Sequence, residues 1–172
     1  MKKGYIQPSK SQQTSLVFLV GKKDRGKHMV MDYRKLNKQT VKNNYPLPLI
    51  MELVDNMGSK QVFTKMDLRW GYNNVRVKEE DEWKAAFTIH GGSFELVIMF
   101  FGMTNSPATF QAIMNEILRD IINEGKVAAF VDNVLVETET EEGYDEVVEK
   151  VLRQLEENDL YIKPEKCHSW AS

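Results

Sequence analysis

Residues 127–137 read VAAFVDNVLVE, in which two short apolar runs are separated by a polar pair. The runs Val127–Val131 and Val134–Val136 are typical of β-strands, and a two-residue connection such as Asp132-Asn133 is typical of a hairpin turn. The stretch therefore predicts a β-hairpin that carries a carboxylate at its tip.

Amphipathic helices are predicted on both sides of this hairpin. Ser106 is a good helix cap, and Pro107 suits the first turn of the helix that precedes the hairpin. Apolar residues recur at helical spacing in both helices, at Phe110, Ile113, Met114, Ile117, Leu118 and Ile121 before the hairpin and at Tyr144, Val147, Val148, Val151, Leu152 and Leu155 after it. A strand at Val62–Met66, ending at Asp67, precedes the first helix, and a strand around Leu160–Lys163 follows the second.

The order of these elements predicts the fold class. With an insertion at residues 68–104 set aside, strand, helix, strand, strand, helix and strand follow one another, which indicates an α+β fold of the split βαβ or ferredoxin-like kind. Right-handed crossovers would make the first and second strands parallel, with the third strand antiparallel between them. Asp67 and Asp132 would then emerge at the same edge of an antiparallel sheet packed on helices, on elements about 5 Å apart.

The amino-terminal part of the chain predicts a separate, smaller lobe. Strands at Leu16–Val20 and Met29–Tyr33 flank a basic turn, and apolar residues at helical spacing predict a helix from Ile50 to Met57, which Gly58 ends. Three further strands are expected in the insertion, at Val75–Val77, Ala85–Ile89 and Phe94–Ile98.

Composition excludes several classes of protein. The chain has 172 residues, 42% of them hydrophobic, which is enough for one compact core or for one core with a small lobe. Its one cysteine, Cys167, excludes an internal disulfide and fits a reducing intracellular compartment, the cytoplasm or the nucleus. No apolar run approaches the roughly 18 residues of a membrane span, and the first ten residues lack the apolar stretch of a signal peptide, so no membrane partner is expected.

Charge is distributed unevenly along the chain. The formal net charge is −2, yet residues 1–44 hold eleven lysines and arginines against two aspartates. Such a segment suits a surface that faces the phosphates of a nucleic acid. Residues 137–159 are strongly acidic, which is typical of a solvated helix face.

Two carboxylates at one sheet edge, beside a basic lobe, suit a magnesium-dependent phosphoryl-transfer site. Mg²⁺ prefers hard oxygen ligands and typically takes one or two protein carboxylates together with substrate phosphates. A pair of ions roughly 4 Å apart can activate the attacking oxygen and neutralise the leaving one. Spacing alone favours a plainer interpretation, in which Asp67 ends a strand and Asp132 forms a turn, because both are common structural uses of aspartate.

Six segments, taken in their order along the chain, favour the metal-site interpretation over the plainer one. They are MDYRKLN (31–37), YPLP (45–48), FTKMDLRWGY (63–72), FGMTNSPATFQ (101–111), FVDN (130–133) and NDLYIKPEKC (158–167). In order and spacing they resemble the successive motifs of reverse transcriptases of retroviruses and LTR retrotransposons, most closely those of Ty3/Gypsy-like elements. The resemblance spans nearly the whole chain and implies an RNA-directed DNA polymerase that extends a primer on an RNA or DNA template with dNTPs.

The resemblance also implies an organisation into polymerase subdomains. Residues 1–60 would form a partial fingers lobe, and residues 61–172 would form a palm with a fingers-like insertion at about 73–104. Within the palm, Asp67 and Asp132 resemble the aspartates that bind two Mg²⁺ or Mn²⁺ ions at the catalytic centre.

Further residues of the resemblance concern the nucleotide. Tyr72 resembles the aromatic residue that excludes a ribonucleotide 2′-hydroxyl, and Lys22 resembles the lysine that contacts the triphosphate, with Lys23 as the alternative if the register shifts by one. The motif that lies under the template base and the primer end matches Phe101, Gly102 and Gln111.

Three departures from the family pattern bear on activity. Asn133 stands in the catalytic turn where the family has a second aspartate, and a unit charge lost about 4 Å from a cation is worth roughly 4 kcal/mol at an effective dielectric of about 20. His28 stands where the family has an arginine, and a neutral imidazole is a poor substitute on a triphosphate. The chain stops at Ser172, before the expected thumb and ribonuclease H regions, so those regions or a partner chain are expected to be needed to hold the template.

Two hypotheses therefore remain open. The first is an RNA-directed DNA polymerase domain, and the second is a catalytically inactive relative that binds nucleic acid or another protein. An RNA-recognition module shares the split βαβ order, but no strand here has its Lys/Arg-Gly-Phe-x-Phe pattern. A nucleotide cyclase is rejected because Ser93 replaces the required carboxylate in the segment HGGSFE (90–95).

Overall fold

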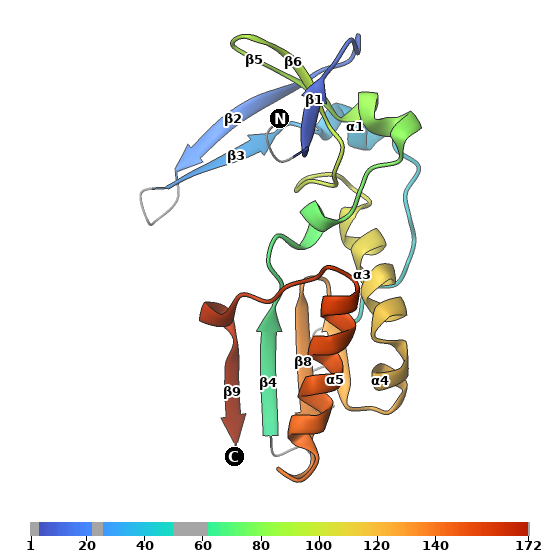
Figure 1. Ribbon diagram of the computed structural model, residues 1–172. Coiled ribbons are helices and arrows are strands. Elements are labelled where there is room, and N and C mark those ends of the chain that lie inside the picture. The colour runs from blue at the N-terminus through green and yellow to red at the C-terminus, as the bar shows by residue number, and fades with distance from the viewer. Residues whose placement is uncertain (1–3, 22–25, 50–61, 172) are drawn as a thin grey trace. The chain divides into compact units, whose positions relative to one another are not determined.

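The chain divides into two compact units, each of which is built from two separate segments. The computed structural model (Figure 1) describes residues 4–21, 26–49 and 62–171. The first unit comprises Met1–Lys42 and Tyr72–Ser106, and the second comprises Asn43–Gly71 and Pro107–Ser172. Residues 43–49 thus group with the second unit, whereas the sequence suggested a boundary near residue 60.

The first unit is built on a five-stranded sheet with the order β1-β6-β5-β2-β3. Its strands are β1 (Ile6–Pro8), β2 (Ser15–Gly21), β3 (Lys27–Met31), β5 (Ala86–Ile89) and β6 (Gly92–Leu96). Neighbouring strands are antiparallel, except that β2 and β5 pair in parallel. The sheet therefore joins strands from both segments of the unit.

Short helices and a small apolar core complete the first unit. The helices are α1 (Arg34–Gln39) and the 3₁₀ turns η2 (Gly71–Asn74) and η3 (Glu79–Ala85). The core contains Met31, Tyr33, Ala85, Phe87, Leu96, Val97 and Ile98. Burial raises the pKa of the Tyr33 hydroxyl, which keeps this core residue neutral.

Most strands of the first unit lie where the sequence predicts them. The predicted strands at 16–20, 85–89 and 94–98 are confirmed as β2, β5 and β6, with ends that differ by one or two residues. The strand expected at Val75–Val77 is wrong, because the chain there has just left η2 and only Arg76 forms an isolated bridge, with Ile98. The helix expected from Ile50 to Met57 lies outside the described residues.

The second unit is built on a four-stranded antiparallel sheet with the order β7-β8-β4-β9. Its strands are β4 (Val62–Asp67), β7 (Val127–Phe130), β8 (Asn133–Thr138) and β9 (His168–Ala171). The helices are α3 (Ser106–Ile117), α4 (Arg119–Asn123), α5 (Tyr144–Glu157) and the 3₁₀ turn η4 (Pro164–Lys166). As predicted, β8 lies between β4 and β7 and runs antiparallel to both.

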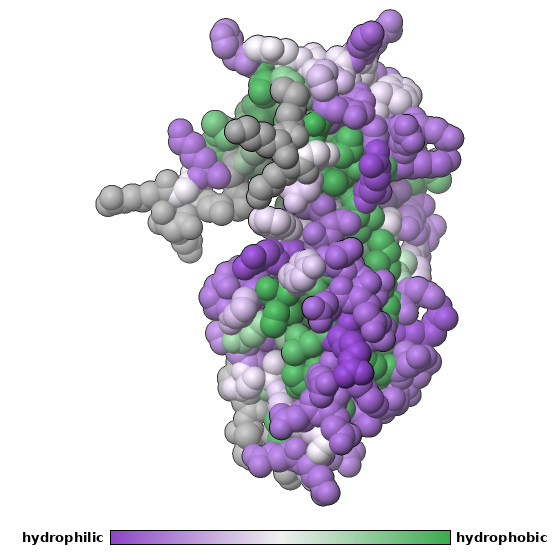
Figure 2. Space-filling model, in the orientation of Figure 1, coloured by the Kyte–Doolittle hydropathy of each residue, from purple (hydrophilic) through white to green (hydrophobic). Residues whose placement is uncertain are grey.

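The helix α5 packs on one face of this sheet. Alternate β4 residues Val62, Thr64 and Met66 are buried, and the hydroxyl of Tyr144, the first residue of α5, is hydrogen-bonded to that of Thr64. Figure 1 shows α5 running alongside β8. Hydrophilic side chains gather over α5 in Figure 2, in keeping with the solvated acidic face that the sequence predicts.

Three details of the second unit correct the sequence-based picture. The predicted long helix is interrupted at Leu118, between α3 and α4. The fourth strand is β9, whereas the expected strand at 160–163 contributes only a bridge between Ile162 and Leu68, because η4 follows at once. The hairpin turn consists of Val131 and Asp132, because Asn133 already pairs with Phe130 in the ladder.

Candidate active site

The backbone brings Asp67 and Asp132 to the same end of the sheet. Asp67 is the last residue of β4, and its Cα partner across the ladder is Asn133, the first residue of β8. The N–H of Leu68 donates to the carbonyl oxygen of Asp132 at 2.8 Å. The two aspartates are thus joined through neighbouring backbone, as the sequence predicts.

The face on which Asp67 lies follows from strand alternation. Residues that are directly opposite in an antiparallel pair share one face of the sheet, and successive residues alternate between faces. Asp67 and Asn133 therefore lie on the face opposite the buried Met66 and Val134. This places polar side chains away from the helix-covered core.

Gly71 leaves room for Asp132. A Cβ added at this buried glycine would lie 3.0 Å from the Cβ of Asp132 and 3.6 Å from its Oδ2. A Cβ contact of this length is tighter than nine in ten real ones, so a larger residue at position 71 would require Asp132 to shift by a few tenths of an ångström. The turn itself is held in an unusual conformation, because Val131 has a φ of 52°.

Gln111 stabilises this turn from within the core. Its side chain is fully buried, its Nε2 donates to the carbonyl oxygen of Ala129 at 2.8 Å, and its Oε1 accepts the N–H of Val131 at 2.8 Å. The sequence pointed to Gln111 as a nucleotide contact. In the structure, its side-chain amide is hydrogen-bonded to the backbone of Ala129 and Val131. These bonds hold the turn that carries Asp132.

Each of the two carboxylates has an internal nitrogen donor. The Asn133 Nδ2 donates to Asp132 Oδ1 at 3.3 Å, and the Lys163 Nζ lies 2.8 Å from Asp67 Oδ1. The side chains of Lys163 and Asp67 are 24% and 17% exposed, so their ion pair is partly shielded from water. Sequence reasoning gave Lys163 no role, because it lies 96 residues beyond Asp67 in the chain.

The predicted nucleotide-binding residues Tyr72, Phe101 and Gly102 belong to the first unit. The rings of Tyr72 and Phe101 meet edge to face, with their centroids 5.0 Å apart. Gly102 has a φ of 93°, which favours glycine, and its carbonyl oxygen accepts a hydrogen bond from Asn37 Nδ2 at 2.7 Å. Lys22 lies outside the described residues.

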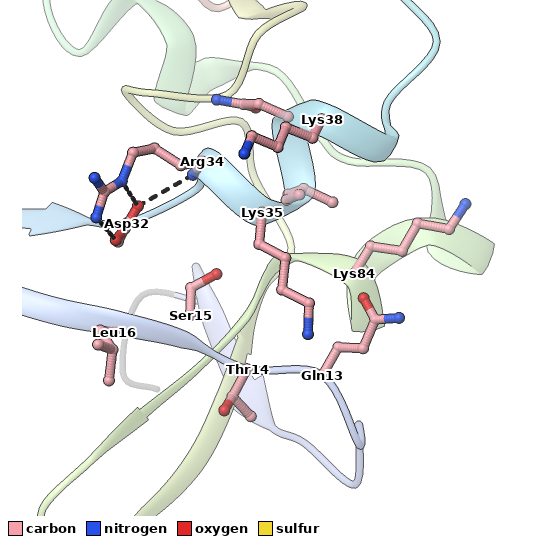
Figure 3. A pocket seen from close by; sticks show the side chains of 11 residues that line it. Gln13, Thr14, Ser15, Leu16, Asp32, Arg34, Lys35, Lys38 and Lys84 are labelled. Carbon is pink, nitrogen blue, oxygen red and sulfur yellow. Dashed lines mark hydrogen bonds and ion pairs between the residues drawn. The ribbon is translucent and has the colours of Figure 1, made fainter.

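The first unit also contains an open, basic pocket of about 660 Å³ between α1 and the start of β2 (Figure 3). Four cationic side chains line it: Arg34, Lys35, Lys38 and Lys84. Lys35 points from α1 toward Gln13 and Thr14 in Figure 3. Among the described residues that line the pocket, Asp32 is the one acidic residue; it accepts hydrogen bonds from the side chain and the backbone N–H of Arg34, which lower its pKa to about 2.

The donor set at the sheet edge fits a hard divalent cation. Carboxylate oxygens are the ligands that Mg²⁺ and Mn²⁺ prefer, and the space left by Gly71 lies beside Asp132. Over the parts of the chain that the structure describes, no three His, Cys, Asp or Glu side chains gather into a metal-binding group. A cation here would therefore have Asp67 and Asp132 as its carboxylate ligands and would take its remaining ligands from other oxygens.

Solved structures of foamy viral protease-reverse transcriptases share this fold. The foamy viral protease-reverse transcriptase in complex with an RNA/DNA hybrid matches with a TM-score of 0.88 and 25% identity, over 96% of this chain and 22% of that one. The native prototype foamy virus protease-reverse transcriptase matches with a TM-score of 0.84 and 26% identity, over 97% of this chain and 22% of that one.

Comparison of the sequence with known families also indicates a reverse transcriptase. The model of the family described as reverse transcriptase (RNA-dependent DNA polymerase) matches residues 20–172, and the chain belongs to this family. The Tf2-7 and Tf2-3 transposon polyproteins of Schizosaccharomyces pombe are 38% and 37% identical to it over 167 residues, which confirms the predicted resemblance to retrotransposon enzymes. These matches cover 97% of this chain but only 12% of the length of each polyprotein. None of the described helices is long and apolar enough to cross a membrane.

Proposed function

We propose that this chain carries the polymerase site of an RNA-directed DNA polymerase. The observation that carries the proposal is the meeting of Asp67 and Asp132 at one end of the sheet, with Leu68 and the carbonyl oxygen of Asp132 hydrogen-bonded at 2.8 Å. In this proposal the second unit is the palm, with a ferredoxin-like split βαβ sheet, and the first unit is the fingers lobe.

Asp67 and Asp132 would hold two Mg²⁺ or Mn²⁺ ions. When bound, such ions would favour the ionised primer 3′-hydroxyl and neutralise charge on the triphosphate. The chain's own contribution is to fix the two carboxylates: the β4–β8 ladder fixes Asp67, while Gln111 and the space at Gly71 fix Asp132. The primer oxygen then attacks the α-phosphate of a dNTP, which forms the new ester bond and releases pyrophosphate.

The first unit would bind the nucleotide and the template-primer. We assign Tyr72 to sugar discrimination and Phe101 and Gly102 to the template base and primer end, supported by the Tyr72–Phe101 ring contact. Lys22 is assigned to the triphosphate by resemblance. The basic pocket supports nucleic-acid binding by this unit, as do the foamy viral complexes with an RNA/DNA hybrid and with double-stranded DNA. We propose that this activity lies inside the cell, in the cytoplasm or the nucleus, where dNTPs are available.

Primer extension on an RNA template tests the proposal directly. We expect incorporation of dNTPs in Mg²⁺ or Mn²⁺ by the native chain, loss of at least 100-fold in Asp67→Ala and in Asp132→Ala, and a higher rate in Asn133→Asp, since charge stabilisation at the reacting phosphate is typically worth about 3–4 kcal/mol. Lys150→Gln on α5 is the matched control, because it removes a charge that pairs with Glu124 near the far end of β7. Extension that survives in Asp67→Ala would refute the assignment of the site.

A second function is favoured by Asn133 and by the Lys163–Asp67 ion pair, both of which reduce the negative charge of the site. A catalytically inactive relative would keep its nucleic-acid or protein binding without nucleotide transfer. Template-primer binding without extension, in both the native chain and Asn133→Asp, would favour this alternative.

A further inference from the structure

Lys163 is fixed beside Asp67 by the backbone as well as by charge. The N–H of Lys163 donates to the carbonyl oxygen of Asp67 at 2.8 Å, and the N–H of Arg69 donates to the carbonyl oxygen of Tyr161 at 2.7 Å. Leu68 and Ile162 form an antiparallel bridge between these two hydrogen bonds. The residues 161–163 thus run along the end of β4, and the root of the lysine side chain stays at Asp67 even when its ammonium moves.

The ammonium and a divalent cation would compete for the same carboxylate. The Lys163 Nζ lies 2.8 Å from Asp67 Oδ1, and the side chains are 24% and 17% exposed. A partly buried pair is screened less by water and salt than one on the open surface. An ion that approaches Asp67 must therefore either share the carboxylate with an ammonium or displace it.

Asn133 adds no negative charge that would offset the lysine. Asn133, the Cα partner of Asp67, is neutral, and its Nδ2 donates to Asp132 Oδ1 at 3.3 Å. Asp67, Asp132 and Lys163 together carry a formal charge of −1. Both carboxylates already have one oxygen turned to an internal nitrogen donor.

We propose that Lys163 is a built-in counter-ion of Asp67 that weakens divalent-metal binding to the free site, so that ions bind well only when a polyanionic nucleotide contributes its phosphates. This inference rests on the proposed function, because it assumes that Asp67 and Asp132 are metal ligands. Lys163 acts here as a regulator of metal affinity and is not assigned a chemical step. The site would remain largely free of metal until substrate arrives.

Mn²⁺ binding to the 172-residue chain, without nucleotide or nucleic acid, tests the inference. Electron paramagnetic resonance of free Mn²⁺ gives the dissociation constant directly. We expect Lys163→Gln to bind Mn²⁺ about tenfold more tightly than the native chain, which corresponds to about 1.4 kcal/mol. Lys163→Arg keeps the positive charge and is expected to stay within about twofold of the native affinity.

Two further variants separate the possible results. Lys150→Gln makes the same change of charge on α5, and we expect it to leave the Mn²⁺ affinity unchanged. If Lys150→Gln increased the Mn²⁺ affinity as much as Lys163→Gln, the effect would come from net charge alone, and the inference would be overturned. Native affinity in Lys163→Gln, with circular dichroism unchanged, also overturns it. Asp67→Ala tests the underlying function: binding that Asp67→Ala abolishes but Lys163→Gln leaves unaltered refutes only the role of the lysine. Binding that persists in Asp67→Ala, or is absent from both the native chain and Lys163→Gln, refutes the metal site itself.

Discussion

Gly71 is the residue on which the position of Asp132 depends most directly. The Cβ of an alanine at this position would lie 3.0 Å from the Cβ of Asp132, which is closer than nine in ten Cβ contacts in proteins. We expect Gly71→Ala to weaken Mn²⁺ binding about tenfold, because the carboxylate must shift. Gly21→Ala is the matched control, since a Cβ there meets nothing within 4 Å. Equal affinities for Mn²⁺ in both variants would contradict the close approach of Gly71 to Asp132.

Asp32 should show the effect of Arg34 in a titration. Hydrogen bonds from the side chain and the backbone of Arg34 lower the Asp32 pKa from 3.8 to about 2. Because the folded-state pKa is depressed, the pair is fully formed above pH 3.8 and is lost as the pH falls through about 2. Carboxyl-carbon NMR should report a midpoint near 2, and Arg34→Gln should return it toward 3.8. A native midpoint near 3.8 would show that the pair does not form in solution.

Among single residues, the sequence identified the site residues that lie within recognisable local motifs. Asp67 and Asp132 stand in recognisable segments, and strand order alone predicted that they would meet. Gln111 and Lys163 act through partners that are 18 to 20 and 96 residues distant, respectively. Such contacts depend on how the backbone folds, so no spacing rule within the sequence could assign them.

At the scale of elements, α5 is the clearest case of a helix whose pattern dictates its packing. Leu155 is 1% exposed and Leu152 is 37% exposed, although both belong to the predicted apolar stripe. We expect Leu155→Ala to lower the free energy of unfolding by about 2–5 kcal/mol, because it leaves a cavity in the core. Leu152→Ala should cost less than about 1 kcal/mol. Urea denaturation measures both, and losses of equal size would contradict the observed orientation of α5.

Two elements that the sequence misplaced have separate physical causes. Segment 160–163 has the apolar character of a strand, but Pro164 begins a 3₁₀ turn directly after it, and the sheet takes β9 as its edge instead. Val131 looks like the end of a strand because its side chain is apolar and β-branched, yet its φ of 52° places it in the turn. At Val131 a tertiary contact outweighs the local preference, because its backbone N–H donates to the Oε1 of the buried Gln111.

At the scale of the whole molecule, positive charge gathers in the first unit. Lys35, Lys38 and Lys84 line the same pocket, and Asp32, the one acidic residue among its described lining, is already paired with Arg34. If phosphates of a nucleic acid bind here, affinity must fall as salt rises, because counter-ions are released on binding. If one of these lysines contacts a phosphate, we expect its change to alanine to reduce the slope of log affinity against log salt concentration by about one.

Fluorescence anisotropy with a labelled RNA/DNA duplex, over a series of salt concentrations, measures that slope. Lys126→Ala and Lys150→Ala in the second unit, where both lysines lie near Glu124, serve as controls and should leave the slope unchanged. A slope near zero for the native chain would exclude phosphate binding as the main source of affinity.

The alternation of the two units along the chain has a consequence for biosynthesis. β4 pairs with β8 and β9, which begin at Asn133 and His168, so β4 leaves the ribosome long before either neighbour exists. At roughly 5–20 residues per second, this strand stays unpaired for several seconds of translation. Nascent chains that stall before residue 133 therefore expose an unpaired strand, and we expect chaperones to bind them there.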